Sequence, residues 1–143
     1  MLIISKNILN NVVFDIFMKE NFRNNMQTNI IPISVIEKDV IEKLLGKDNK
    51  INYLLRKQYA KALVDNRWFS GKGFFTSFNL SNDQSTNEIG NSFYIDVVGV
   101  KINNIDVGFV LFIEKGKLKT LEGFTYYGDW PTEITNYTIF HEK

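Results

Sequence analysis

Hydrophobic positions recur at helical spacing through the first 63 residues of the chain. In the segment 1–28 they are Ile8, Leu9, Val12, Val13, Ile16 and Phe17. Steps of three and four residues predict an amphipathic helix, which a polar break then follows. Polar residues such as Lys6, Asn10 and Asp15 interrupt every apolar run well before the ~20 residues that a membrane span needs. We expect this helix to pack on the core, with partner binding as the alternative.

A pair of helices is expected over residues 29–63. Ser34 precedes Glu37 by three positions, the spacing of a capping box in which both side chains bind amides at the helix start. The apolar face of this helix is Ile36, Val40, Ile41, Leu44 and Leu45. Asp48 or Asn49 can cap the next helix. Its apolar face is Ile51, Leu54, Leu55, Tyr59, Ala62 and Leu63.

From Val64 onward the pattern changes to short runs rich in aromatic and β-branched residues, separated by glycine and asparagine, which is typical of strands. The expected strands are FFTSFNL, SFYIDVVGVKI, VGFVLFIEK and KLKTLEGFTY, with NYTIF as a short fifth. Asn103–Asn104 and Lys115–Gly116 suit tight hairpins because these residue types tolerate positive φ. Short connections predict that neighbouring strands pair antiparallel.

The run GFVLFI is apolar at every side-chain position, so its strand is expected to be central and covered on both faces. Phe109, Val110, Leu111 and Phe112 should then all be buried. The expected fold class is α+β, with two to three N-terminal helices packed on an antiparallel β-meander of four to five strands. The expected organisation is one domain over residues 1–143, in which 1–28 form the N-terminal helix and polar break, 29–63 the helical pair and 64–143 the sheet.

Composition narrows the function by exclusion. The 143 residues carry a formal net charge of +1, which lacks the basic excess that generic nucleic-acid binding requires. The absence of cysteine excludes disulfides, thiolate metal sites and thiol nucleophiles. His141 is the single histidine, so a histidine triad or a multi-histidine metal site is not expected. The chain is expected to be cytoplasmic, without a cofactor.

The segment SGKGFF, residues 70–75, is superficially similar to a phosphate-binding loop. It lacks the G-x-x-x-x-G-K-[ST] spacing and leads into a strand rather than a helix. Gly71 and Gly73 are therefore expected to permit a bend or bulge at the start of the strand. No catalytic, cofactor-binding or metal-binding residue is assigned.

The stretch LEGFTYYGDWP, residues 121–131, combines carboxylates, aromatic residues and a Trp-Pro pair. We expect a structural corner in which Glu122 accepts hydrogen bonds from nearby donors, Gly123 permits a bulge and Pro131 ends the strand. Adjacent residues of one strand face opposite ways, so at least one of the two tyrosines should be exposed. The hypothetical partner-binding residues are Tyr126, Tyr127, Asp129 and Trp130.

Part of the chain resembles small bacterial proteins that are mostly of unassigned function. The resemblance rests on SGKGFFTSF followed by VGFVLFIEKGKLKTLEGFTYYGDWP, which match a pattern of GFF, GFVLF, a hairpin and a closing LEG(Y/F)TY...WP motif. It covers residues 68–131 and extends to the helix LLRKQYAKA; Ser70, Lys72 and the extra N-terminal helix depart from it. Some proteins of this kind look like immunity proteins, which neutralise a co-encoded toxin by binding it.

Two function classes follow. The first is a non-enzymatic protein-binding domain, an immunity protein that neutralises a co-encoded bacterial toxin. The second is a small enzyme that uses Glu122 with Asp96 or Asp129 as paired carboxylates. The absence of a histidine-based, cysteine-based or nucleotide-binding motif favours the first class.

Overall fold

The structure is a computed structural model that describes residues 29–80 and 88–140. The helix expected in residues 1–28 and the single histidine, His141, lie outside this part of the chain. The chain divides into two compact units, Met1–Ile30 and Ile31–Lys143. The second unit holds every helix and strand given below.

Two helices precede the sheet in the described residues, α2 (Ile33–Leu44) and α3 (Lys50–Lys61). The prediction for the start of α3 is confirmed, because the Asn49 side chain accepts a hydrogen bond of 2.8 Å from the amide of Asn52. The capping box predicted for α2 is wrong. Pro32 occupies the cap position, and no side chain there binds a helix amide. The Glu37 side chain is buried instead of bonding back to the helix start.

Within residues 29–80 and 88–140, six strands form one antiparallel sheet, which is more than the four to five expected. They are β1 (Leu63–Phe69), β2 (Gly73–Asn79), β3 (Phe93–Ile102), β4 (Ile105–Glu114), β5 (Lys117–Thr125) and β6 (Tyr137–Ile139). The additional strand is β1, which begins at Leu63, a residue that helical spacing assigned to α3. Its polar residues hid the strand pattern.

The strand order is β1-β2-β5-β4-β3-β6, so only β3, β4 and β5 form the expected meander. The hairpin of β1 and β2 adds to the free edge of β5, and β6 adds to the edge of β3. A simple meander would place β2 beside β3. This expectation is wrong, because β2 pairs with β5 instead. Asn103 and Asn104 have φ of 50° and 64°, and Lys115 and Gly116 have φ of 50° and 77°, as their hairpins require.

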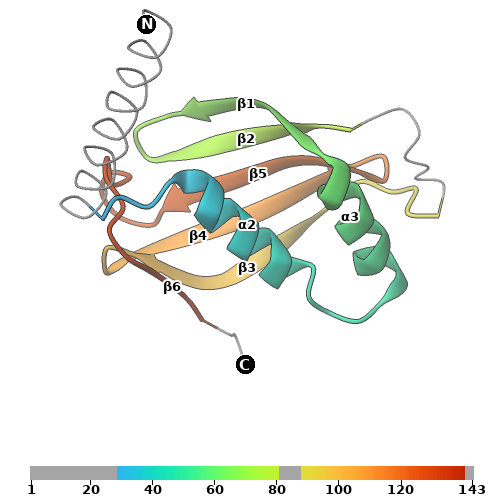
Figure 1. Cartoon of the computed structure of the whole chain (residues 1–143), viewed down its shortest axis with the longest axis horizontal. Coiled ribbons are helices and arrows are strands. Elements are labelled where there is room, and N and C mark those ends of the chain that lie inside the picture. Colours follow the sequence, from blue (N-terminus) through green and yellow to red (C-terminus); the bar gives the residue numbers. More distant parts are fainter. Residues whose placement is uncertain (1–28, 81–87, 141–143) are drawn as a thin grey trace, which may run out of the picture. The chain divides into compact units, whose positions relative to one another are not determined.

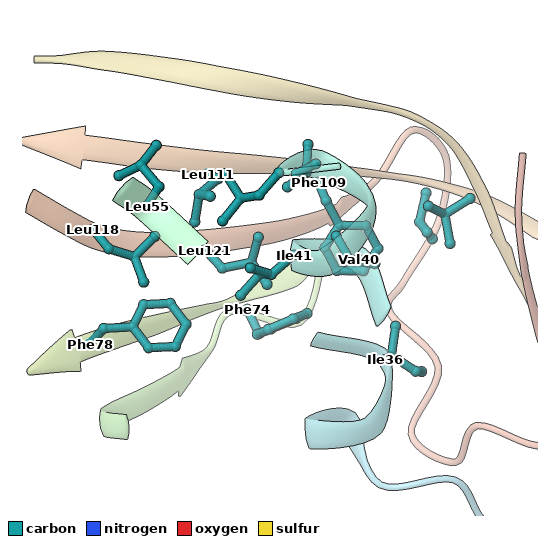
Figure 2. Packing of buried hydrophobic residues seen from close by; sticks show 14 of the residues in the cluster. Ile36, Val40, Ile41, Leu55, Phe74, Phe78, Phe109, Leu111, Leu118 and Leu121 are labelled. Carbon is teal, nitrogen blue, oxygen red and sulfur yellow. The ribbon is translucent and has the colours of Figure 1, made fainter. Parts of the chain in front are cut away.

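Both described helices lie on one face of the sheet (Figure 1). Val40 and Ile41 of α2 gather with Phe74 and Phe109 of the sheet in one buried cluster (Figure 2). Leu55 of α3 belongs to the same cluster as Leu111 of β4 and Leu118 of β5 (Figure 2). This layer is the core of the unit.

A buried glutamine joins α3 to the β4–β5 hairpin. The side-chain amide of Gln58 donates to the carbonyl of Gly116 at 2.9 Å, and its oxygen accepts from the amide of Leu118 at 2.8 Å. The buried side of α3 therefore contains Asn52, Leu55 and Gln58 rather than Ile51, which is 42% exposed.

The prediction for the run GFVLFI is confirmed only in part. Its strand, β4, is internal to the sheet, and Phe109 and Leu111 are buried. Phe112 is 37% exposed and Val110 is only partly buried. The expectation that both faces are covered is therefore wrong for the described residues, where helices cover one face.

Candidate functional site

The face of the sheet that points away from α2 and α3 is defined by strand alternation. In β4 the buried residues Phe109 and Leu111 point toward the helices, so Val110 and Phe112 point the other way. The strand register shows which residues of the neighbouring strands lie on the same face. Val110 pairs with Glu122 of β5, which pairs with Phe75 of β2.

Aromatic side chains lie on this second face on the strands from β1 to β3. We call it the open face; its members are Trp68, Phe75, Tyr94, Val110, Phe112, Glu122, Phe124 and Tyr126. Trp68 is 58% exposed, Tyr94 63% and Tyr126 57%. Single exposed aromatic residues are ordinary, but several on one sheet face form a patch of the kind that binds partners.

Ring contacts organise the open face into two groups. At the β1 edge, Trp68 stacks on Phe75 with ring centroids 5.7 Å apart. On β5 and just beyond it, the ring of Phe124 meets the ring of Tyr126 edge to face at 5.3 Å. These pairs hold their rings in fixed positions on the sheet surface.

Glu122 lies between these two groups. Its cross-strand neighbours are Phe75 and Val110, and Phe124 follows two residues later on the same side of β5. The carboxyl is partly buried, and this burial raises its pKa above the ordinary value. Burial is the one cause of the shift. Within residues 29–80 and 88–140, no side chain or amide donates a hydrogen bond to Glu122, and none forms an ion pair with it.

Glycines shape both faces at this end of the sheet. On the open face, a Cβ on Gly108 would lie 2.4 Å from the Phe124 ring, which therefore sits directly over the β4 backbone. On the helix side, a Cβ on Gly123 would lie 2.4 Å from Phe74 and 3.0 Å from Phe109. Gly123 thus makes room for aromatic packing. The bulge expected there is wrong, since its pairing with both neighbours is regular and the β4–β5 shift occurs near Phe112.

The corner after β5 packs on the helix side of the sheet. Trp130 is only 8% exposed and meets the rings of Phe74 at 5.1 Å and Phe109 at 6.2 Å. Its amide donates to the carbonyl of Gly71 at 2.8 Å. β5 ends at Thr125, well before Pro131, so the proline does not end the strand as expected. Trp130 is therefore part of the core, and it presents little surface for the partner contact predicted for it.

Two other corner residues are exposed. The Tyr127 side chain is 89% exposed. Asp129 forms an ion pair of 2.8 Å with Lys72, whose hydrogen bond and charge lower the pKa of the carboxyl. The corner thus separates the predicted contact residues, because Tyr126 lies on the open face, Tyr127 and Asp129 extend into solvent, and Trp130 is buried.

The paired-carboxylate alternative depends on Glu122 with Asp96 or Asp129. Asp96 pairs in register with Val110, which pairs with Glu122, so the two acidic positions are two strands apart, about 10 Å. Among the side chains that the structure describes, no charged group contributes to the raised pKa of Glu122. Asp129 is bound to Lys72 and does not contribute to it either. The electrostatics of Glu122 thus give no sign of a coupled second acid.

A second polar cluster lies on the helix side, in a groove of about 490 Å³ between α2, α3 and β1. Arg67 donates to Oε1 of Glu37 through Nη2 at 2.6 Å and Nε at 3.1 Å, and the Thr76 hydroxyl donates to Oε2. The Glu37 side chain is only 4% exposed. Burial, and then the charge of Glu37, raise the pKa of the Tyr59 hydroxyl in the groove wall.

Both carboxylate oxygens of Glu37 are thus occupied by internal donors. The cluster joins α2 to the β1–β2 hairpin, and it explains why an acid can occupy the buried side of a helix. Sequence reasoning missed this role. Helical spacing could have indicated it, because Glu37 precedes Ile41 by four residues and Leu44 by seven and therefore lies on the apolar face of the helix.

A third contact ties the last strand to α2. The Tyr137 hydroxyl donates to Asp39, and this bond, followed by burial, raises the pKa of Tyr137 to about 12. No group of three or more acidic, histidine or cysteine residues that could hold a metal ion occurs in the part of the chain that the structure describes. No helix within that part is long and apolar enough to cross a membrane.

No model of a known protein family matches the chain, and neither a curated protein nor a solved structure shows significant similarity to it. The resemblance to small bacterial immunity-type proteins stays an expectation from the sequence. The function of the chain is therefore inferred from the site itself.

Proposed function

We propose that this chain is a non-enzymatic protein-binding domain whose contact surface is the open face of the sheet. The observation that carries the proposal is the gathering of exposed and partly exposed aromatic side chains on that face. Trp and Tyr are the residues that most often dominate binding energy at interfaces. Strand backbone supports them rigidly, so little side-chain entropy is lost on binding.

The partner we propose is a co-encoded bacterial toxin, which the chain neutralises as an immunity protein. The sequence resemblance described above supports this choice. A sheet face also suits the task, because a flat and rigid surface can occlude a catalytic groove. The near-neutral net charge of +1 favours a protein surface over a nucleic-acid backbone as the target.

The test is capture of a partner from the bacterium that encodes the chain. The native chain is compared with a double variant, Trp68→Ala with Tyr94→Ala, which removes two exposed rings from opposite parts of the open face. The matched control is Tyr53→Ala, which removes a ring of similar exposure, 52%, from α3. All forms should melt alike, because surface substitutions rarely change stability by more than about 0.5 kcal/mol.

We expect one protein to be retained by the native chain and by Tyr53→Ala and lost by the double variant. Its gene should encode a toxin domain next to the gene for this chain, and its toxicity should be blocked only by forms that bind. Retention by the double variant would overturn the proposal. A dimer of the chain alone that dissociates in the double variant would assign the open face to self-association and would overturn it as well.

A further inference from the structure

The unpaired carboxylate of Glu122 is the chemically distinctive feature of the open face. The acids of the other two clusters have partners, since Glu37 is bound by Arg67 and Asp129 by Lys72. The two cross-strand neighbours of Glu122, Phe75 and Val110, are apolar, and among the described residues it has no hydrogen-bond donor or ion-pair partner. Partial burial of an unpaired carboxylate is unfavourable for the free protein. A binding partner that supplies a cation would compensate that cost.

We propose that Glu122 and the rings around it form a recognition site for one arginine side chain of the protein partner. This inference rests on the proposed function and specifies the chemistry of the partner at the centre of its interface. The occupant follows from charge complementarity: Glu122 carries a negative charge among aromatic rings, and its cross-strand neighbours, Phe75 and Val110, supply no cation.

The geometry suits a guanidinium better than an ammonium. Its planar fork can donate two parallel hydrogen bonds to the Glu122 carboxylate. Its face can stack on an aromatic ring, and it is more weakly hydrated than the ammonium of lysine. The Phe75 ring is adjacent to Glu122 across β2, and the Phe124 ring follows it on β5. An arginine placed over Glu122 would therefore meet a ring on at least two sides.

The neighbouring ring pairs prepare this position. Trp68 stacks on Phe75 and Tyr126 packs against Phe124, so the rings that flank Glu122 are held before any partner arrives. Gly108 contributes by letting the Phe124 ring lie close to the sheet, and Glu122 beside it is partly exposed. A preformed site costs less on binding than one that must be assembled.

The test uses small probes on the full chain, so it does not require the partner. N-acetyl-arginine amide is titrated into isotope-labelled protein and followed by the amide resonances of Phe75, Glu122 and Phe124. N-acetyl-citrulline amide is the uncharged control with nearly the same shape, and N-acetyl-lysine amide is the ammonium control. The variants are Glu122→Gln and, as a matched change of charge, Glu114→Gln, which lies at the exposed end of β4.

We expect saturable shifts with the arginine probe and about tenfold weaker binding of the citrulline probe, because charge-assisted hydrogen bonds are roughly twice as strong as neutral ones. Glu122→Gln should remove the preference for arginine, and Glu114→Gln should keep it. Equal binding of arginine and citrulline probes, or of arginine and lysine probes, would overturn the assignment.

The probe titration and the capture experiment can fail independently of each other. If the probes show no preference while the Trp68 and Tyr94 double variant still loses the captured protein, the arginine site is wrong and the open face stands as the interface. If the double variant keeps the captured protein, the proposed function is wrong regardless of the probes.

Discussion

At the residue scale, two acidic side chains, Glu37 and Glu122, have opposite environments. Glu37 is almost fully buried and is bound by Arg67 and Thr76, so its charge is compensated inside the protein. Glu122 is only partly buried, yet no described residue compensates it. The sequence suggested the reverse, a simple cap at Glu37 and a hydrogen-bonded corner at Glu122. Sequence spacing identifies neighbours along a helix or strand, but it does not show which elements pack across them.

Glu122→Gln is predicted to leave stability unchanged or to raise it at neutral pH. The folded state raises the pKa of this carboxyl above its ordinary value of 4.5, so the folded protein holds the proton more tightly than the unfolded chain. Stability is therefore lost as pH rises from that value through the folded pKa. Melting curves of both forms should coincide below pH 4.5 and diverge above it in favour of glutamine. A less stable variant at pH 7 would mean that the carboxylate has a donor after all.

Glu37→Ala is predicted to cost about 3 kcal/mol of unfolding free energy, because it leaves the partly buried Arg67 and the buried Thr76 without their acceptor. Ser34→Ala is the matched control on the same helix. Its hydroxyl does not cap α2, so its cost should stay within about 0.5 kcal/mol. Denaturant unfolding measures both values. A larger loss at Ser34 than at Glu37 would restore the capping box.

At the element scale, pattern and turn chemistry predicted most of the strands. Four of the expected runs coincide with β2, β3, β4 and β5 to within two residues at each end, and NYTIF contains β6. The hairpin residues were also identified, because positive φ limits the residue types that a tight turn accepts. The strand β1 was missed, since LVDNRWF buries none of its side chains fully and alternates poorly. An edge strand has few neighbours and so carries a weak sequence signal.

Gly123→Ala tests the aromatic packing that fixes β5 against its neighbours. The added methyl would overlap the rings of Phe74 and Phe109, so we predict a loss of about 1–3 kcal/mol, typical of an overpacked core. Gly99→Ala in β3 is the control, because its Cβ would meet Phe140 at an ordinary 3.7 Å. That variant should be neutral or slightly stabilising. Equal melting temperatures of the two variants would contradict the packing role assigned to Gly123.

At the scale of the whole molecule, the sequence predicted the α+β class and the helices that pack on an antiparallel sheet. It did not predict the strand order, because the position of β2 beside β5 depends on long-range pairing that local pattern does not encode. The open face was missed for the same reason. Phe75 and Glu122 are far apart in sequence and become neighbours only through the register between β2 and β5.

The Tyr127 and Asp129 corner gives a test of where the interface ends. Both residues are exposed, but neither lies on the open face. A double variant, Tyr127→Ala with Asp129→Ala, is predicted to weaken partner binding by less than about tenfold, since contacts at the rim of an interface contribute little. Titration calorimetry with the captured partner measures the change. A greater loss of affinity than Trp68→Ala causes would place the centre of the interface at the corner.

The most direct test of the central claim is the dissociation constant of the captured partner for the native chain and for the single variant Trp68→Ala. Trp68 is exposed on the open face and stacks on Phe75 beside Glu122, so it occupies the position expected of a binding hot spot. We predict an affinity at least about thirtyfold weaker in the variant, which corresponds to the 2 kcal/mol that defines a hot spot, with an unchanged melting temperature. Native affinity in a stably folded Trp68→Ala variant would contradict the account.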